Sequence, residues 1–190
     1  MSLTIPGITD PATLACIARS RKYKQYRKSV EDALANRCPF CELDPNYNKV
    51  IPGIPSKVLR AWHCNPPEKF TRYHFIISPI RHVTDTLQYS EEEWSDVRSV
   101  TDHLLRGFAF GFRGILIRDG DATMSAGTIQ HSHIHLMVPD GTGRVESPFC
   151  KTPEEEAAGV VRAIIYEKIR QGTAWVQLSS EERVLVADRM

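Results

Sequence analysis

The chain lacks any long apolar run, and this absence excludes the simplest membrane architecture. No stretch approaches the roughly 20 apolar residues that a membrane-spanning helix needs, and the N-terminus has no apolar core of a signal peptide. Lysine and arginine total 24 against 23 aspartates and glutamates, so a net charge of +1 provides no overall field for binding nucleic acid or a membrane surface. We therefore expect a soluble, cytoplasmic protein.

The sequence also lacks a disulfide framework, internal repeats and low-complexity segments. Five cysteines are an odd number, and in a chain of 190 residues without a signal peptide they do not suggest a secreted, disulfide-stabilised fold. The length suits one domain with peripheral additions, and a hydrophobic content of 42% is enough to form a core.

Two cysteines do form a motif, a CxxC at residues 38–41. Such a motif either binds a metal or carries out thiol–disulfide chemistry. The redox alternative requires the motif to open a helix after a strand, whereas a proline-rich loop follows here at residues 43–55. This context favours half of a zinc site. The remaining cysteines have no informative spacing and are expected to be small buried side chains: Cys16, Cys64 and Cys150.

Hydrophobic periodicity predicts an α+β fold, with an antiparallel meander sheet and helices packed on it. Strands are predicted at residues 57–62, 73–78, 114–118 and 130–138. Helices are predicted at residues 11–36, 90–107 and 152–171, with a short one after residue 179. The basic stretch 19–28, which also contains two tyrosines, is interpreted as a solvated helix face, with contact to RNA or phosphate as the alternative.

Three of the seven histidines occupy alternate positions in the segment 130–138: His131, His133 and His135. In a strand, alternate side chains share one face. Each imidazole brings two polar nitrogens that need partners, so three in a row are costly to bury and favour a chemical role. The outer two α-carbons of such a strand are about 13 Å apart, too far for all three rings to bind one zinc ion.

Residues 131–137 resemble the motif of the histidine triad (HIT) superfamily, His-φ-His-φ-His-φ-φ with φ hydrophobic, except that Ser132 is polar. Residues 125–130 resemble the small-residue loop that these proteins place ahead of the motif to hold phosphate. Residues 74–83 resemble the family's strand and turn, HφφφxPxxHφ. The resemblance implies a HIT-like fold, commonly a two-fold dimer. It also implies a HIT domain at residues 38–140, with an N-terminal helical extension at 1–37 and a C-terminal helical extension at 141–190 packed on the same domain.

The resemblance implies a covalent reaction at the middle histidine. His133 is assigned as the nucleophile that attacks the α-phosphorus of a nucleotide and forms a nucleotidyl-histidine. A neutral imidazole suits this role at physiological pH. Its other ring nitrogen is expected to donate a hydrogen bond to the backbone carbonyl of His131, and His135 is expected to contact the phosphoryl or bridging oxygens.

The resemblance also assigns residues that bind the substrate. Asn65 corresponds to the position that contacts the ribose hydroxyls, although an Asn before Pro is also an ordinary turn former. Arg118 stands where relatives carry an amide side chain near the α-phosphate, and an arginine there clamps phosphate or pairs with a neighbouring aspartate. Three residues of the loop are expected to hold phosphate, unless the loop is a plain turn: Ser125, Gly127 and Thr128.

In metal-binding members of the superfamily, CxxC is joined by the histidine after the turn and by the first histidine of the triad. The corresponding ligands here are Cys38, Cys41, His82 and His131, which implies a structural zinc site. Three further residues are rival ligands: His63, Cys64 and His74.

Three functions remain open at this point. His135 favours a hydrolase acting on nucleoside phosphoramidates or dinucleoside polyphosphates, because many transferase and phosphorylase members have glutamine there. The CxxC motif and the loop at 125–133 favour a dinucleoside polyphosphate phosphorylase or nucleotidyltransferase. The third possibility is a non-catalytic nucleotide-binding interaction module.

Overall fold

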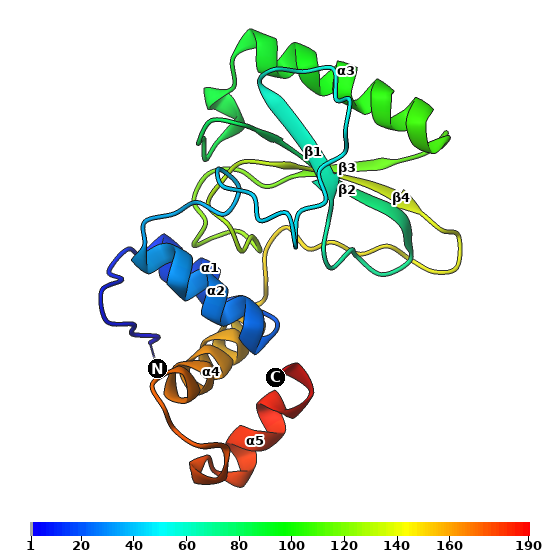
Figure 1. The fold of residues 1–190 in the computed structure, drawn as a ribbon. Coiled ribbons are helices and arrows are strands. Elements are labelled where there is room, and N and C mark those ends of the chain that lie inside the picture. The colour runs from blue at the N-terminus through cyan, green and yellow to red at the C-terminus, as the bar shows by residue number, and fades with distance from the viewer. Residues whose placement is uncertain (1) are drawn as a thin grey trace. The chain divides into compact units, whose positions relative to one another are not determined.

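The computed structural model describes residues 2–190, and these residues form two compact units. A helical unit contains the chain up to Cys38 together with residues 121–130 and 149–190. A sheet unit contains residues 39–120 and 131–148. Figure 1 shows the elements of both along the chain. The predicted division at 37/38 and 140/141 remains a prediction.

The sheet unit is built on four antiparallel strands, β1 (Leu59–His63), β2 (Thr71–Pro79), β3 (Gly114–Ile117) and β4 (Ile134–Pro139). This confirms the predicted α+β class. The strand order is β1-β2-β4-β3, which differs from a sequential meander. After β2 the chain forms a long helix and then the edge strand β3. The last strand, β4, lies between β2 and β3.

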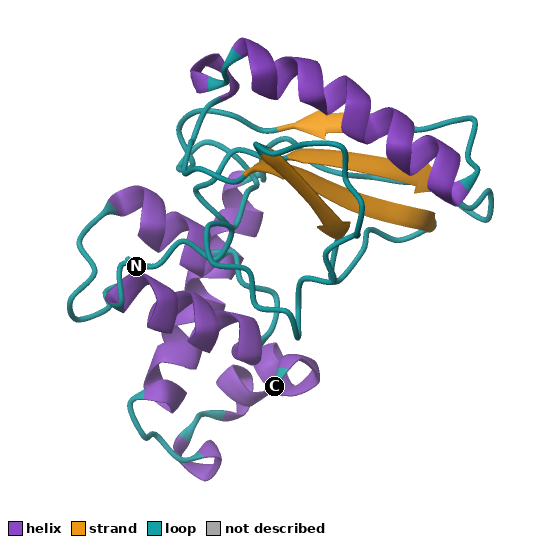
Figure 2. Cartoon of the chain, turned by 45° about the horizontal axis from the view of Figure 1, so that its top comes forward, coloured by secondary structure: helices purple, strands orange, loops and turns teal. Residues whose placement is uncertain are grey.

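That helix, α3 (Glu91–Phe108), covers one face of the sheet (Figure 2). It begins as predicted, with a complete capping box between Ser90 and Glu93. Its apolar stripe packs against the inward-facing side chains of the strands, because alternate strand residues share a face. The core includes Leu59, Ala61, Phe75, Ile77, Val100, Leu104 and Leu136.

The predicted start of the last strand is wrong. β4 begins at Ile134, so His135 is the one triad histidine within it, and His131 and His133 precede the strand. The bonding of the intervening Ser132 explains the difference. Its N–H donates to the carbonyl of Val83 in the turn after β2, at 2.7 Å, and its hydroxyl donates to Asp119. The residues before Ile134 are therefore hydrogen-bonded to loops, because the backbone pairing of β4 with β2 ends at Ile134.

The helical unit contains α1 (Pro11–Ala18), α2 (Tyr23–Leu34), α4 (Pro153–Arg170) and α5 (Ser180–Val186). Three short 3-10 helices complete the described structure: η1 (Thr86–Gln88), η2 (Trp175–Gln177) and η3 (Ala187–Arg189). Helix α4 begins with the predicted Thr152 cap and Pro153. The prediction of one helix over 11–36 is wrong, because the chain leaves the helix at Arg19 and re-enters at Tyr23.

The basic stretch is only partly a solvated face. Arg21, Lys22, Lys24 and Arg27 are exposed, as expected of such a face. Tyr26, however, is fully buried, and its hydroxyl donates to Glu167 of α4 at 2.8 Å. The aromatic side chains interleaved with the basic ones therefore pack the helices together. Within residues 2–190, no helix combines the length and apolarity that crossing a membrane requires.

Candidate active site and metal centre

His133 is held in one tautomer by the backbone beside it. Its Nδ1 lies 2.6 Å from the carbonyl oxygen of His131. A carbonyl only accepts, so Nδ1 carries the proton and Nε2 holds the lone pair. Burial lowers the pKa of His133 to about 4, so the ring is neutral at physiological pH. An oriented, neutral imidazole with its lone pair on Nε2 is chemically a nucleophile.

Sequence reasoning missed Phe40, the residue inside the CxxC motif. Its ring meets the ring of His133 edge-on at a centroid distance of 5.0 Å, and the ring of His131 at 6.0 Å. Its carbonyl accepts from Arg60 of β1, so both its backbone and its ring are fixed. An aromatic residue between the cysteines gave no separate signal, because nothing in the spacing indicates which rings it meets.

His135 lies within a line of hydrogen-bonding groups. The N–H of Glu68 donates to Nδ1 of His74 at 3.0 Å, so that nitrogen is an acceptor and the proton of His74 is on Nε2. This Nε2 lies 2.9 Å from Nδ1 of His135 and donates to it. The proton of a neutral His135 must then be on its Nε2. Burial lowers the pKa of His135 to about 2, which keeps the ring neutral.

The Nε2–H of His135 faces a second donor. Nη1 of Arg118 lies 3.2 Å from this nitrogen, and a guanidinium has only donors. Arg118 is anchored at its other atoms, because Nε donates to the carbonyl of Pro148 at 2.9 Å and Nη2 to the hydroxyl of Ser147 at 2.7 Å. Two donors thus converge where the sequence predicted phosphate. An anionic oxygen is the group that accepts from both.

The two aspartates that were considered as partners of Arg118 accept hydrogen bonds from loop residues. Asp119 accepts hydrogen bonds from the hydroxyls of Ser132 and Thr86. Asp121 accepts from the N–H and the hydroxyl of Thr123. Both carboxylates therefore stabilise loops.

The four predicted zinc ligands come together. Cys38 ends the first segment of the helical unit and Pro39 begins the sheet unit, so the CxxC spans the boundary in sequence. The ligand atoms of Cys38, Cys41, His82 and His131 all lie within 4.8 Å of one another. Sγ of Cys41 is 3.5 Å from Nδ1 of His82 and 3.6 Å from Nδ1 of His131. Bonds of roughly 2.0–2.3 Å in a tetrahedron separate ligand atoms by about 3.3–3.8 Å, so these distances fit zinc.

The tautomer of His131 also fits a metal ligand. Its Nε2 lies 3.1 Å from the carbonyl of Pro79, which accepts the proton and leaves the lone pair on Nδ1, the atom that faces Cys41. A backbone acceptor behind the ring is the usual way to orient a ligating histidine. Burial lowers the pKa of His131 to about 4, so the neutral form that a metal needs predominates at pH 7.

The rival ligands are less suited to a metal. Cys64, His74 and His135 form a second group whose ligand atoms lie within 4.8 Å of one another. The nitrogen of His74 that faces His135 carries a proton, however, because the other accepts from Glu68. A metal there would have to displace that proton and oppose the N–H of Glu68. His63 packs among aromatic rings, with its ring centroid 5.1 Å from that of Phe75.

The remaining predicted residues lie in loops. Asn65 is in the turn between β1 and β2, in the sheet unit, and its assignment to ribose remains a prediction. Ser125, Gly127 and Thr128 belong to the loop 121–130 of the helical unit. The N–H of Gly127 donates to the hydroxyl of Ser125 at 3.1 Å, so the loop has a defined internal turn. The expectation that Cys150 is buried is wrong, because it lies exposed just before α4.

Comparison with known proteins gives no match to a family model and none to a curated protein. Solved structures of histidine triad proteins do match. A zinc-bound histidine triad family protein from Mycobacterium smegmatis is 24% identical, with 72% of this chain and 97% of that chain covered and a TM-score of 0.44. A histidine triad nucleotide-binding protein from Candida albicans is 16% identical, covering 72% and 99%, with a TM-score of 0.46. At these scores, the case for a function depends on the residues of the chain itself.

Zinc content tests the metal centre. We expect purified protein to contain one zinc per chain by mass spectrometry of the metal, and Cys38→Ser or Cys41→Ser to lose it together with several degrees of thermal stability, because each removes a thiolate ligand. Cys150→Ser is the matched control, since this exposed cysteine is not one of the four ligands. Unchanged metal content in both ligand variants would refute the assignment.

The pH dependence of stability tests the burial of the triad. The pKa of His133 is lowered to about 4 and that of His135 to about 2, against roughly 6.5 in an unfolded chain. Between these values the unfolded chain binds protons that the folded chain does not. The free energy of unfolding should therefore fall as pH falls below about 6.5, by up to about 1.4 kcal/mol per pH unit for each histidine.

Urea denaturation between pH 7.5 and pH 5 measures this slope. His135→Asn should reduce the slope by about the contribution of one histidine, because the substitution removes the titration of His135. This residue is not one of the four zinc ligands. A free energy of unfolding that stays constant over this range would contradict the burial of the triad.

Proposed function

We propose that this chain is a nucleotide hydrolase of the histidine triad type, acting on nucleoside phosphoramidates or dinucleoside polyphosphates through a covalent intermediate on His133. The observation that carries the proposal is the pair of donors on Arg118 and His135 beside the neutral ring of His133. The ring centroids of His135 and His133 are 4.8 Å apart. A phosphoryl group has the negative oxygens that such donors select. A nucleophile beside them suits attack on its phosphorus.

The proposed reaction has two displacements. Nε2 of His133 forms a bond to the α-phosphorus, and the bond to the leaving nitrogen or oxygen breaks with its electron pair on the leaving atom, which takes a proton from solvent. Water then forms a P–O bond while the N–P bond breaks and returns its pair to Nε2, and the proton of the water is released. Arg118 and His135 donate to the phosphoryl oxygens during both steps.

The substrate contacts that follow from the resemblance complete the proposal. Asn65 binds the ribose hydroxyls, and Ser125, Gly127 and Thr128 bind phosphate through their amides and hydroxyls. Zinc at Cys38, Cys41, His82 and His131 is structural, and its contribution is to tie the CxxC segment to the triad. We place the reaction in the cytoplasm, because a reducing compartment keeps such a pair of cysteines from forming a disulfide and leaves both available to a metal.

Trapping the intermediate tests this function. We expect an acid-labile nucleotidyl adduct on His133 when the protein is mixed with adenosine phosphoramidate or a diadenosine polyphosphate and quenched. His133→Ala should reduce turnover on the order of 10³-fold or more while keeping the affinity for adenosine monophosphate within a few fold, since the nucleophile and not the binding groups is removed. His103→Ala, on α3, is the matched control and should keep full turnover.

The products decide between the proposal and its alternatives. Nucleoside monophosphate as the product supports hydrolysis. Nucleoside diphosphate formed when inorganic phosphate is added identifies a phosphorylase. Nucleotide binding that is unaffected by His133→Ala, with no turnover and no adduct in the wild-type protein, would replace the enzyme with a non-catalytic binding module.

We also propose that the chain forms a two-fold homodimer through the edge of the sheet. β3 is the edge strand, Ile115 on it is 53% exposed, and Phe112 just before it is 71% exposed. Large apolar side chains on an exposed edge favour pairing with a second strand. Sedimentation equilibrium should give twice the mass of the chain, and Ile115→Lys should shift the mass toward the monomer. A monomer at micromolar concentration in the wild-type protein would contradict this proposal.

A further inference from the structure

Ser132 is a buried polar residue of the triad segment to which the proposed mechanism gives no role. It is 2% exposed, and a buried hydroxyl is costly unless it is hydrogen-bonded. The carboxylate of Asp119 lies 2.9 Å from its Oγ and only accepts, so the proton of Ser132 is used there. The hydroxyl of Tyr89, at 3.2 Å, must then donate to Ser132. Burial raises the pKa of Tyr89 to about 12, so the proton for this bond is retained.

The bond between Ser132 and Asp119 continues the register of the sheet beyond its last backbone pair. The pairing of β3 with β4 ends at Ile117 and Ile134. Two positions further in the same register, Asp119 is opposite Ser132, and a side-chain hydrogen bond joins them there. Two segments that no longer pair through their backbones are therefore still held together.

Arg118 lies between these two attachments. In the register that they share, it is opposite His133. Opposite residues of an antiparallel pair share a face, and His135, two positions along, shares it too. The distance of 3.2 Å between Nη1 of Arg118 and Nε2 of His135 agrees with this placement. Ser132 and Asp119 belong to the opposite face, because each is one position away.

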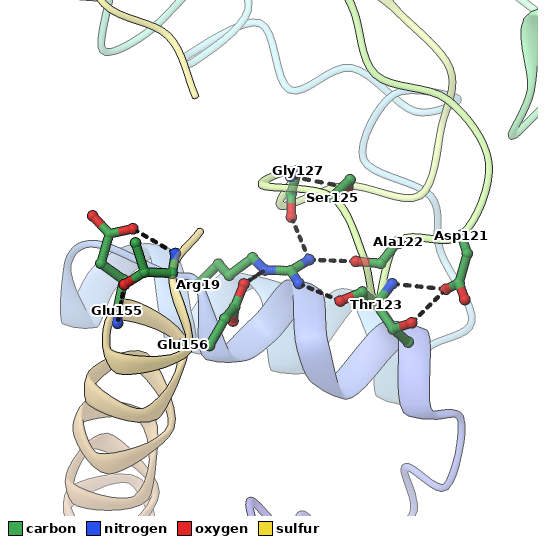
Figure 3. Close-up of polar contacts among 9 residues, drawn as sticks. Arg19, Asp121, Ala122, Thr123, Ser125, Gly127, Glu155 and Glu156 are labelled. Atoms are coloured by element: carbon green, nitrogen blue, oxygen red, sulfur yellow. Dashed lines mark hydrogen bonds and ion pairs between the residues drawn. The ribbon is translucent and has the colours of Figure 1, made fainter. Parts of the chain in front are cut away.

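A comparison of two arginines indicates that Arg118 is held for a ligand. Arg19, in the helical unit, has an acceptor at each guanidinium nitrogen (Figure 3): Glu156 for Nε and carbonyls of the loop 121–130 for Nη1 and Nη2. Such a set of acceptors is typical of a structural arginine. Nη1 of Arg118 instead meets Nε2 of His135, which carries a proton, and an acceptor for both donors would come with the substrate.

An arginine needs to be held at both ends to act in this way. Its flexible side chain has many rotamers, and selecting one of them during binding costs conformational entropy. The guanidinium of Arg118 is held by the carbonyl of Pro148 and the hydroxyl of Ser147. Its main chain is held by the bond between Ser132 and Asp119. The entropy is then lost during folding, and binding does not have to supply it.

We propose that Ser132 is a positioning residue for phosphate binding, because its bond to Asp119 holds the guanidinium of Arg118 in place before the substrate arrives. The inference rests on the proposed function and deepens it, since it identifies what fixes the cation that binds the phosphate. Ser132 does not contact the substrate, because its side chain lies on the other face. It acts through Asp119 and Arg118.

The test compares binding of adenosine 5′-monophosphate with binding of adenosine, by calorimetry. Ser132→Ala should weaken the affinity for the monophosphate by about 10-fold, the order expected when a charge-assisted hydrogen bond loses its orientation, while the affinity for adenosine stays within about twofold. Ser132→Thr keeps the hydroxyl and should keep most of the affinity. The KM should rise in parallel with the lost affinity for the monophosphate.

A double-mutant cycle tests whether the effect passes through Arg118. Arg118→Met should itself weaken binding of the monophosphate, and Ser132→Ala added to it should weaken binding no further, because the guanidinium that Ser132 positions is gone. A loss from Ser132→Ala that is equally large with and without Arg118 would overturn the inference.

A control separates positioning from plain stability. Ser56 also lies in the sheet unit, and its hydroxyl donates to Asp96 at 2.6 Å. Ser56→Ala therefore removes a comparable bond between a serine and an aspartate. It should lower the melting temperature and leave the ratio of the two affinities unchanged, whereas Ser132→Ala should change both.

The outcomes distinguish the inference from the function that it rests on. A wild-type protein that forms no adduct and binds no monophosphate refutes the proposed function, and this inference with it. A wild-type protein that forms the adduct, with an unchanged affinity ratio in Ser132→Ala, overturns the inference alone.

If Ser132→Ala does not fold, Asp119→Ala decides, because it removes the other end of the same bond at an exposed residue. Removing a negative charge should by itself favour an anion. A selective loss of monophosphate affinity in Asp119→Ala therefore supports the inference, and an unchanged or increased affinity overturns it.

Discussion

Backbone groups decide which nitrogen carries the proton in His131, His133 and His74. The carbonyl of His131 accepts from Nδ1 of His133, and the carbonyl of Pro79 accepts from Nε2 of His131. The N–H of Glu68 donates to Nδ1 of His74 and so sets the direction of the bond from His74 to His135. Because each ring has two nitrogens and one proton when neutral, fixing one nitrogen fixes the chemistry of the other.

The tautomers of His131 and His133 suit the two rings to different chemistry. On His131 the lone pair is on Nδ1, facing a cysteine, and the ring is suited to a metal. On His133 the lone pair is on Nε2, and the ring is suited to attack on phosphorus. Both have a pKa of about 4 because of burial, so the pKa does not distinguish them. The position of the backbone acceptor does.

Much of the site could be predicted from residue identity and spacing. The alternating histidines and the CxxC motif indicated which side chains to examine, and the structure brings the four proposed zinc ligands together. The start of β4 could not be predicted, because it depends on a bond from Ser132 to a turn about fifty positions earlier. The break between α1 and α2 was missed for a related reason, since α-helical propensity continues through residues 19–22 while Arg19 is drawn into the loop 121–130. Its partners are carbonyls, which every residue has, so no side-chain pattern marks them.

His131 contributes to two sites through chemically separate parts. Its imidazole faces the cysteines, while its carbonyl orients the ring of His133. A substitution of His131 removes the imidazole but keeps the carbonyl, since every amino acid supplies the same peptide oxygen. Natural variation at this position would therefore record the demands of metal binding alone. The orientation of the His133 ring depends on a main-chain carbonyl, so a comparison of sequences would not reveal it.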